Sequence, residues 1–389
     1  MFLPRLYLVL CVVLCGSFSL RAERMRINFF EEEVILCYKQ LPIIEGHELT
    51  DDLTGQFLAR MEENDLSCLM DGIKQYQLQL RLNDWLTYLL IRQVGETILG
   101  PERTNEVTLF SWYVLANMGY KVQLNYTVSQ FYLSVFSLDK VYNIPSKKHG
   151  DGYLVEISSF QNPKFLKALI SQRSNYYLNI NGSDFDFSMN ELPLFKNPKI
   201  KSRVYSFEFQ NETYDLTADI DMNMIYLMYK YPELKVAEHC KVSLSPSLYR
   251  SLILSLRNYT ASMSEENALA FLLSFTQQAF KYKTDLDAYQ INNLTFTAEE
   301  VLFYEYSDCE DRSVLLSILV KEVLNKETIL IEFTDHTGVG VKLDKQIGKP
   351  ISYNNVIYTY CEPTGPGAVL KPGELPLELR ESTYTINAD

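Results

Sequence analysis

The sequence predicts an α+β protein in which helices and antiparallel strands fall in separate runs. Apolar residues recur at three- and four-residue spacing in segments within 51–118 and 246–324, as expected of helices that bury one side. Short alternating runs, many of them rich in Tyr and Phe, predict strands. A helix followed by a strand pair and a further strand occurs twice, once on each side of a strand-rich middle region.

We therefore expect four segments. Residues 1–22 are predicted to be a signal peptide, 23–160 an α+β domain, 161–240 a β-rich middle domain, and 241–389 a second α+β domain that carries the chemistry. Because no low-complexity tract or long Pro/Gly linker separates the last three, we expect them to form one compact body.

The elements of the first domain follow from local signals. Residues 26–38 predict a strand, a tight acidic turn and a second strand, and helices are predicted within 53–61, 67–80 and 83–99. Asn83 is placed as an N-cap, and Gly100 closes the third helix. The next helix should end near Gly119, and strands are predicted at 123–128, 130–136 and 152–160.

The second half has a similar succession. Strands are predicted within 176–189, 204–222 and 224–232 because of their alternation and their Gly and Asn turns. After Pro246, two helices are predicted at 248–263 and 265–280, and both should pack against a helix that starts near Cys309.

Charge excludes two classes of partner. The net charge is −13 and the isoelectric point is about 5.0, whereas nucleic acids and anionic membranes bind basic surfaces. We therefore expect no nucleic-acid partner.

The N-terminus resembles an export signal. A short basic start ending at Arg5 precedes the apolar run Leu6–Leu14, and cleavage is expected after Ser19. A membrane anchor and a lipid-modified Cys11 or Cys15 are the alternatives. Since no later segment reaches the ~18 apolar residues of a membrane span, we expect an exported, periplasmic protein that is not integral to a membrane.

Five cysteines remain after the signal: Cys37, Cys68, Cys240, Cys309 and Cys361. An odd number in an exported chain predicts at least one free thiol, and two disulfides plus one thiol would fit. No paired Cys or His spacing indicates zinc, so we expect neither a metal nor another cofactor.

Cys309, His336 and Glu362 are the candidate catalytic residues. The histidine follows the cysteine by 27 residues and the acid follows the histidine by 26, which leaves room for a helix with a strand and then a hairpin. Cysteine at a helix start, histidine and then a carboxylate is an ordered nucleophile, base and orienting group.

Each of these residues also has a structural interpretation. Ser307 to Glu310 fits a capping box with Ser307 as N-cap, which favours a thiolate at Cys309, but the acids at 308, 310 and 311 oppose it unless a cation such as imidazolium is near. Cys309 could instead be a buried structural cysteine or half of a disulfide, with Cys361 as partner. A lone histidine is more often structural, and an acid before Pro363 is commonly a turn residue.

The glycines that follow His336 have a functional interpretation as well. Thr337 to Leu343 reads TGVGVKL, and small residues beside a catalytic base would let a substrate backbone approach closely.

Three motifs resemble the transglutaminase-like superfamily, whose members have a papain-type fold. They are D-C-E-D-R-x-x-L-L at 308–316, D-H-x-x-x-x-V at 335–341 and Y-x-Y-C-E-P-T at 358–364. The chain looks closest to exported transglutaminase-like proteins of the Bacteroidetes. The resemblance covers about 265–375, including FKYKTD at 280–285, and implies a Cys-bearing helix packed on an antiparallel sheet.

The resemblance also implies a Cys-His-Asp triad, with Cys309 as nucleophile, His336 as base and Glu362 in the usual place of Asp. Two positions depart from the pattern: the acid is one methylene longer, and Thr337-Gly338 stand where an aromatic residue usually follows the histidine. The activity implied is that of a cysteine peptidase or amidase acting on a peptide, a protein or cell-wall peptide. Cross-linking and a non-catalytic binding or assembly module are the alternatives.

The repeated order of elements predicts an internal duplication whose first copy, about 50–160, lacks the chemistry. In this alignment Ser129 takes the place of His336, no cysteine opens the first helix, and the acid position is apolar. An accidental match between two common helix-and-hairpin units is the alternative.

Overall fold

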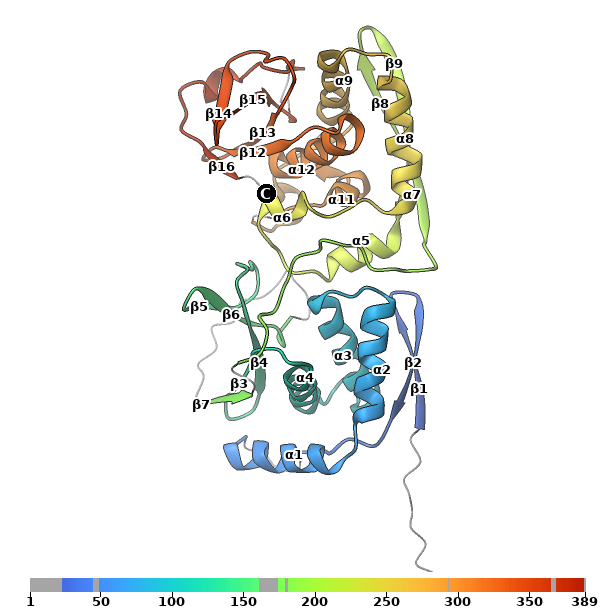
Figure 1. Ribbon diagram of the computed structural model, residues 1–389, viewed down its shortest axis with the longest axis vertical. Coiled ribbons are helices and arrows are strands. Elements are labelled where there is room, and N and C mark those ends of the chain that lie inside the picture. Colours follow the sequence, from blue (N-terminus) through green and yellow to red (C-terminus); the bar gives the residue numbers. More distant parts are fainter. Residues whose placement is uncertain are drawn as a thin grey trace, which may run out of the picture.

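The computed structural model describes residues 23–44, 49–160, 174–178, 181–292, 294–364 and 369–387. The predicted signal peptide lies outside these residues. Figure 1 shows two lobes, one coloured blue to green and the other yellow to red, with helix α5 between them. Helices and antiparallel strands are mixed in both lobes, so the α+β prediction is confirmed.

The N-terminal lobe begins with a hairpin and four helices. Their bounds are β1 (Glu23–Phe29), β2 (Glu32–Tyr38), α1 (Asp51–Glu63), α2 (Ser67–Gln79), α3 (Asp84–Leu99) and α4 (Thr104–Met118). Asn83 caps α3 as predicted, because its side-chain oxygen accepts the N–H of Leu86. Gly119 ends α4 with a left-handed φ of 100°, which a glycine adopts without strain.

A five-stranded antiparallel sheet completes this lobe, with α4 packed against β3 and β4. Its strands are β3 (Val122–Tyr126), β4 (Phe131–Ser137), β5 (Ser146–His149), β6 (Gly152–Glu156) and β7 (Ser174–Leu178), in the spatial order β5-β6-β4-β3-β7.

The C-terminal lobe opens with a longer hairpin and a series of helices. These are β8 (Ile200–Phe209), β9 (Glu212–Asp221), α5 (Met222–Tyr229), α6 (Val236–His239), α7 (Pro246–Leu248), a π-helical turn at Tyr249–Ile253, α8 (Leu254–Thr260) and α9 (Glu265–Gln278). Short elements then lead to the cysteine helix: β10 (Lys281–Tyr282), α10 (Asp285–Tyr289), α11 (Ala298–Phe303), β11 (Tyr306–Ser307) and α12 (Cys309–Leu319), which continues as a π-helical turn at Val320–Leu324.

The second sheet follows α12. Its strands are β12 (Thr328–Glu332), β13 (Thr337–Val341), β14 (Pro350–Tyr353), β15 (Val356–Cys361) and β16 (Thr385–Asn387), in the order β14-β15-β13-β12-β16. Helix α12 packs against β12 and β13, and α9 packs against α12, as predicted.

The two sheets have the same strand order, so β5, β6, β4, β3 and β7 correspond to β14, β15, β13, β12 and β16. The hairpin registers correct the sequence alignment by one residue. Tyr126 pairs with Phe131 as Glu332 pairs with Thr337, so Gln130, and not Ser129, occupies the place of His336. Strands β6 and β15 likewise place Ser158 at the position of Glu362. Ser158 is polar, whereas an apolar residue was expected at this position of the first copy.

The described residues of the predicted middle domain, 161–240, are divided between the lobes, and β8 and β9 form a two-stranded antiparallel sheet. Strand β7 pairs with β3 of the first sheet, whereas buried side chains of β8 and β9 belong to the core of the C-terminal lobe. The predicted strand at 224–232 is instead mostly helix α5. Met224 and Leu227 face the first core and Ile225 the second, so this helix is apolar on both sides and resembles a buried strand in sequence.

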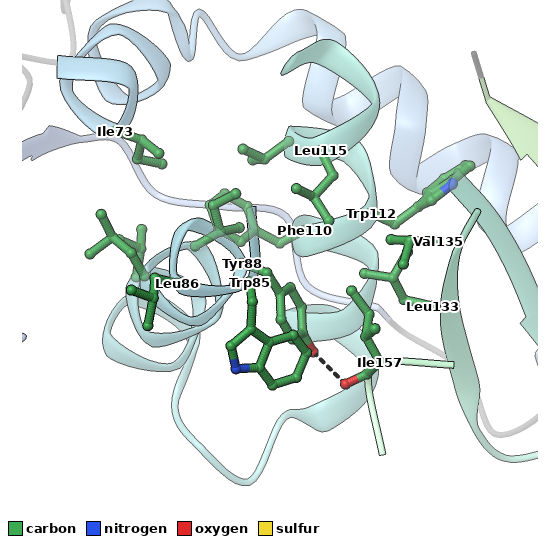
Figure 2. Close-up of a cluster of buried hydrophobic side chains, with 14 of the residues drawn as sticks. Ile73, Trp85, Leu86, Tyr88, Phe110, Trp112, Leu115, Leu133, Val135 and Ile157 are labelled. Carbon is green, nitrogen blue, oxygen red and sulfur yellow. Dashed lines mark hydrogen bonds between the residues drawn. The ribbon is translucent and has the colours of Figure 1, made fainter. Parts of the chain in front are cut away.

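Several large aromatic side chains are buried in the core of the N-terminal lobe. Figure 2 shows Trp85 and Tyr88 of α3 close to Phe110 of α4, and Trp112 of α4 on the side of Leu133 and Val135 of the sheet. The hydroxyl of the buried Tyr88 donates to the carbonyl of Ile157 at 3.0 Å, which joins α3 to the end of β6 and satisfies its polar atom.

One disulfide connects β2 to α2, between Cys37 and Cys68, whose Cα atoms are 6.1 Å apart. Cys309 and Cys361 are buried free thiols, and Cys240 is buried as well. The expectation of two disulfides is therefore wrong, and so is the alternative that pairs Cys309 with Cys361.

Replacing both Cys37 and Cys68 by serine should lower the free energy of unfolding by about 2–4 kcal/mol, because the bond closes a loop of 31 residues in the unfolded chain. Denaturant unfolding with and without dithiothreitol measures this. Dithiothreitol should lower the unfolding midpoint of the wild type to that of the variant and leave the midpoint of the variant unchanged. Equal midpoints in all four samples would contradict the assignment.

Candidate active site

Cys309 is the first residue of α12 and is 7% exposed. The N-cap is Asp308, not Ser307 as predicted, and the Asp308 N–H donates to the Oδ2 of Asp311 at 3.1 Å. Ser307 lies in β11 instead. The sulfur therefore stands at a helix N-terminus, where the first N–H groups have no partner within the helix and favour negative charge.

His336 approaches the sulfur from the turn between β12 and β13. Its Nδ1 lies 3.0 Å from the Sγ of Cys309. The turn is closed by the Phe333 N–H, which donates to the His336 carbonyl at 2.8 Å, and Ser313 of α12 donates to the carbonyl of Thr337. These bonds fix the distance between the turn and the cysteine helix.

Glu362 follows the last residue of β15 and is fully buried. Its Oε2 lies 2.7 Å from the Nε2 of His336 and accepts the hydroxyl of Tyr360, also at 2.7 Å. Its Oε1 accepts the N–H of Thr364 at 3.0 Å. The carboxylate is thus held by three donors and orients the imidazole through the nitrogen that faces away from sulfur.

The electrostatics of the three groups are mutually supportive. Burial opposes the imidazolium, but hydrogen bonds to Cys309 and Glu362 outweigh it and raise the pKa of His336 to about 10. Burial likewise opposes the carboxylate, yet the hydrogen bonds and positive charge of His336 hold the pKa of Glu362 below its usual value. At neutral pH His336 is therefore a cation beside the sulfur, which favours a thiolate.

Asp308, one of the acids beside Cys309, opposes a thiolate less than the sequence suggests. Burial, followed by the charges of Asp285 and Glu310, raises the pKa of Asp308 to about 8. Asp308 is therefore mostly protonated at pH 7 and does not oppose negative charge on Cys309.

Arg312 joins the segments that surround the site. Only 1% of its surface is exposed, and its guanidinium donates to the hydroxyl of Ser307 and to the carbonyls of Gln277, Phe280 and Thr364 at 2.8–3.3 Å. These partners lie in β11, at the end of α9, before β10 and after Glu362. One side chain thus fixes the cysteine helix relative to the acid-bearing loop.

Tyr282 lies on the open side of the sulfur. It pairs with Ser307 through the short parallel ladder of β10 and β11, and its hydroxyl is 3.9 Å from the Sγ of Cys309. Burial and then the charge of Cys309 raise the pKa of Tyr282, so the hydroxyl stays protonated and can donate a hydrogen bond.

Gly338 makes room for the aromatic ring that supports Glu362. A Cβ at Gly338 would lie 2.6–2.7 Å from atoms of the Tyr360 ring and hydroxyl. Gly338 therefore leaves the space that Tyr360 occupies, and the approach of a substrate backbone to these glycines stays a prediction.

The structure brings all three predicted site residues into contact, and it adds three supporting residues that sequence reasoning missed. Tyr360 shares a strand face with Glu362 at a spacing of two, and Arg312 follows Cys309 by three residues on one helix, so both spacings carried a signal. The approach of Tyr282 depends on a two-residue ladder and had no sequence signal.

One group of carboxylates has the spacing of metal ligands within the residues that the structure describes. Oxygen atoms of Asp285, Asp308 and Asp311 all lie within 4.8 Å of one another. Such oxygen ligands suit a hard cation, and the group contains neither cysteine nor histidine for zinc.

Among the described residues, no helix is long and apolar enough to cross a membrane. Comparisons with family models, with curated proteins and with solved structures found no match.

Replacing Arg312 by leucine should lower the free energy of unfolding by at least about 3 kcal/mol, because three buried carbonyls lose their donor. Chemical denaturation measures the change. Arg257→Leu is the matched control, since the exposed Arg257 donates to the Glu322 carbonyl and lies over the Tyr249 ring, and it should cost under ~1 kcal/mol. Equal losses in the two variants would contradict the role given to Arg312.

Proposed function

We propose that the protein is an exported, transglutaminase-like cysteine hydrolase that cleaves peptide or amide bonds through Cys309, His336 and Glu362. The observation that carries the proposal is the continuous chain from Sγ to Nδ1 at 3.0 Å and from Nε2 to Oε2 at 2.7 Å. A nucleophile, a base and an orienting acid within hydrogen-bond distance form the arrangement that acyl transfer requires.

The first half of the reaction forms a thioester. The thiolate of Cys309 attacks the carbonyl carbon, a C–S bond forms, and the carbonyl electron pair moves onto oxygen. As this oxyanion collapses, the C–N bond breaks, and the imidazolium of His336 gives its Nδ1 proton to the leaving amine.

The second half restores the enzyme. Neutral His336 accepts a proton from water, the hydroxide attacks the thioester carbon, and the C–S bond breaks to release the acid and the thiolate. An amine in place of water would give cross-linking by the same steps. Hydrolysis is the proposal, in agreement with the activity implied by the resemblance.

Two kinds of donor stand where an oxyanion would form. The first N–H groups of α12 have no partner within the helix, and the protonated hydroxyl of Tyr282 lies 3.9 Å from the sulfur. Hydrogen bonds from both kinds of donor would strengthen as negative charge develops on the substrate oxygen.

The departure from the family pattern at Glu362 is compatible with this chemistry. The longer side chain still accepts the imidazole proton at 2.7 Å, and Tyr360 and the Thr364 N–H occupy its other bonding positions. Gly338 makes space for Tyr360, so both departures from the pattern belong to one local arrangement.

The N-terminal lobe is proposed to be a duplicated copy without the chemistry. Its sheet has the same strand order, but α4 opens on Thr104 where α12 opens on Cys309, and Gln130 and Ser158 take the other two places.

Export to the periplasm is part of the proposal. It rests on the basic and apolar N-terminal sequence and on the Cys37–Cys68 bond, which persists in oxidising compartments. Peptides, proteins and cell-wall peptides are the substrates proposed for such an enzyme.

Iodoacetamide should label Cys309 rapidly down to about pH 6 in the wild type, because His336 remains a cation there. In His336→Ala the rate at pH 6 should fall ~10- to 100-fold and rise only near pH ~8.5, the behaviour of an ordinary thiol. Peptide mapping by mass spectrometry follows Cys309 separately from Cys240 and Cys361.

The two buried thiols serve as internal controls, since burial raises the pKa of Cys361. Identical profiles in the wild type and in His336→Ala would overturn the enzyme proposal and favour a non-catalytic binding module.

A further inference from the structure

A pocket of about 570 Å³ borders the start of α12 at the junction of the two lobes. Its walls come from the start of α10, the segment before α6, the sheet edge formed by β12 and β16, and Tyr142 of the N-terminal lobe. The Tyr142 N–H donates to the carbonyl of Glu233 at 2.8 Å, so the junction is held by a backbone bond at this wall. The pocket is also lined by the residues that precede and follow Cys309 in the chain, Asp308 and Glu310.

Negative groups dominate the lining. Five carboxylates face one lysine, and the charged side chains are Glu233, Asp285, Asp308, Glu310, Glu332 and Lys235. Asp308 and Glu310 are the residues on either side of Cys309 in the chain. A cation bound by them would sit next to the amide bond that Cys309 attacks.

Burial distinguishes this pocket from an ordinary acidic surface, which a chain of net charge −13 would have in many places. Asp285 and Asp308 are only 8% and 9% exposed. Among the described residues, no hydrogen-bond donor faces the buried Oδ1 of Asp308. A buried carboxylate oxygen without a donor is costly and is expected to have a partner in the functional state.

Burial and the nearby acids make positive charge favourable beside Asp285 and Asp308. Burial is the largest cause that raises the pKa of Asp285 to about 6 and of Asp308 to about 8, and the charge of Glu310 adds to both.

We propose that this pocket binds a cationic side chain of the substrate, an ammonium or a guanidinium group, next to the scissile amide. This deepens the proposed function and rests on it, since the substrate class it names is a peptide with a basic residue near the cleaved bond. Asp308 and Glu310 at the start of α12 and Glu332 at the end of β12 provide the acidic groups.

A bare metal ion fits these observations less well. Asp311, the third carboxylate of the cluster, has both oxygens engaged by backbone donors, Oδ1 with Phe296 at 2.7 Å and Oδ2 with Asp308 at 3.1 Å, and it does not line the pocket. The volume of about 570 Å³ also greatly exceeds that of a single ion and suits an organic side chain.

The test uses short acylated peptides that end in an acyloxymethyl ketone, which alkylates an active-site thiolate. Lysine, arginine, norleucine or glutamate is placed at the first or second residue before the ketone. The rate of covalent addition to Cys309 of the full chain is followed by intact-mass spectrometry. At one of the two positions, lysine or arginine should react ~10-fold faster than norleucine, a gain in the range of a close charge pair.

Variants assign that preference to the pocket. In Asp308→Asn and in Glu310→Gln the ratio of the lysine to the norleucine rate should fall toward one, and asparagine retains the capacity to cap α12. Glu332 also lines the pocket, so Glu332→Gln provides the same test of the lysine to norleucine ratio if Asp308→Asn does not fold. Glu322→Gln lies at the other end of the α12 segment, away from the pocket, and should keep the wild-type ratio.

The outcomes separate the two proposals. Rapid iodoacetamide labelling at pH 6 with equal rates for all peptides would overturn the cationic pocket and leave the cysteine enzyme. A lysine preference that survives in all three pocket variants would overturn it as well. Rates that depend on added Ca²⁺ or on chelator, and not on lysine, would assign the carboxylates to a metal ion instead. Slow labelling by every reagent would overturn the enzyme proposal itself.

Discussion

The buried guanidinium of Arg312 is the interaction on which the rest of the site depends. It bonds four segments that are far apart in sequence: the end of α9, the approach to β10, β11 and the loop after Glu362. Without it, the cysteine helix and the loop after Glu362 would lose their direct side-chain connection at Thr364. The charge of Arg312 also lies near Asp308 and Asp311. Its hydrogen bonds and these acids together offset the cost of burying the guanidinium.

The two lobes show how one architecture can carry two roles. Both sheets have the same strand order and both pack against a helix, yet one helix begins with Thr104 and the other with Cys309. The first lobe is not separate from the site, because Tyr142 forms one wall of the acidic pocket. If that pocket receives a basic side chain as proposed, the lobe without chemistry contributes to selecting the substrate.

Much of the fold was predictable because local signals decided it. Asn83 begins α3 through its side-chain cap, Gly119 ends α4 through its left-handed conformation, and the alternating runs of β4, β8 and β9 are visible in the sequence. Helix α5 was mistaken for a strand because burial on both sides removes the helical pattern. The three site residues were predictable by type and order, but Tyr282 and the pocket arise from tertiary packing, and the pairing of Cys37 with Cys68 could not be chosen by spacing.

The central claim is that His336 is a cation held between a sulfur and a carboxylate, and its own titration tests this most directly. The chain has only four histidines, so imidazole resonances of isotope-labelled protein can be assigned by replacing each in turn. The account predicts a pKa of about 10 for His336, because its hydrogen bonds to Cys309 and Glu362 outweigh burial, and a return toward ~6.5 in Cys309→Ala combined with Glu362→Gln. A value near 6.5 in the wild type would mean that no such ion pair forms, and would contradict the account.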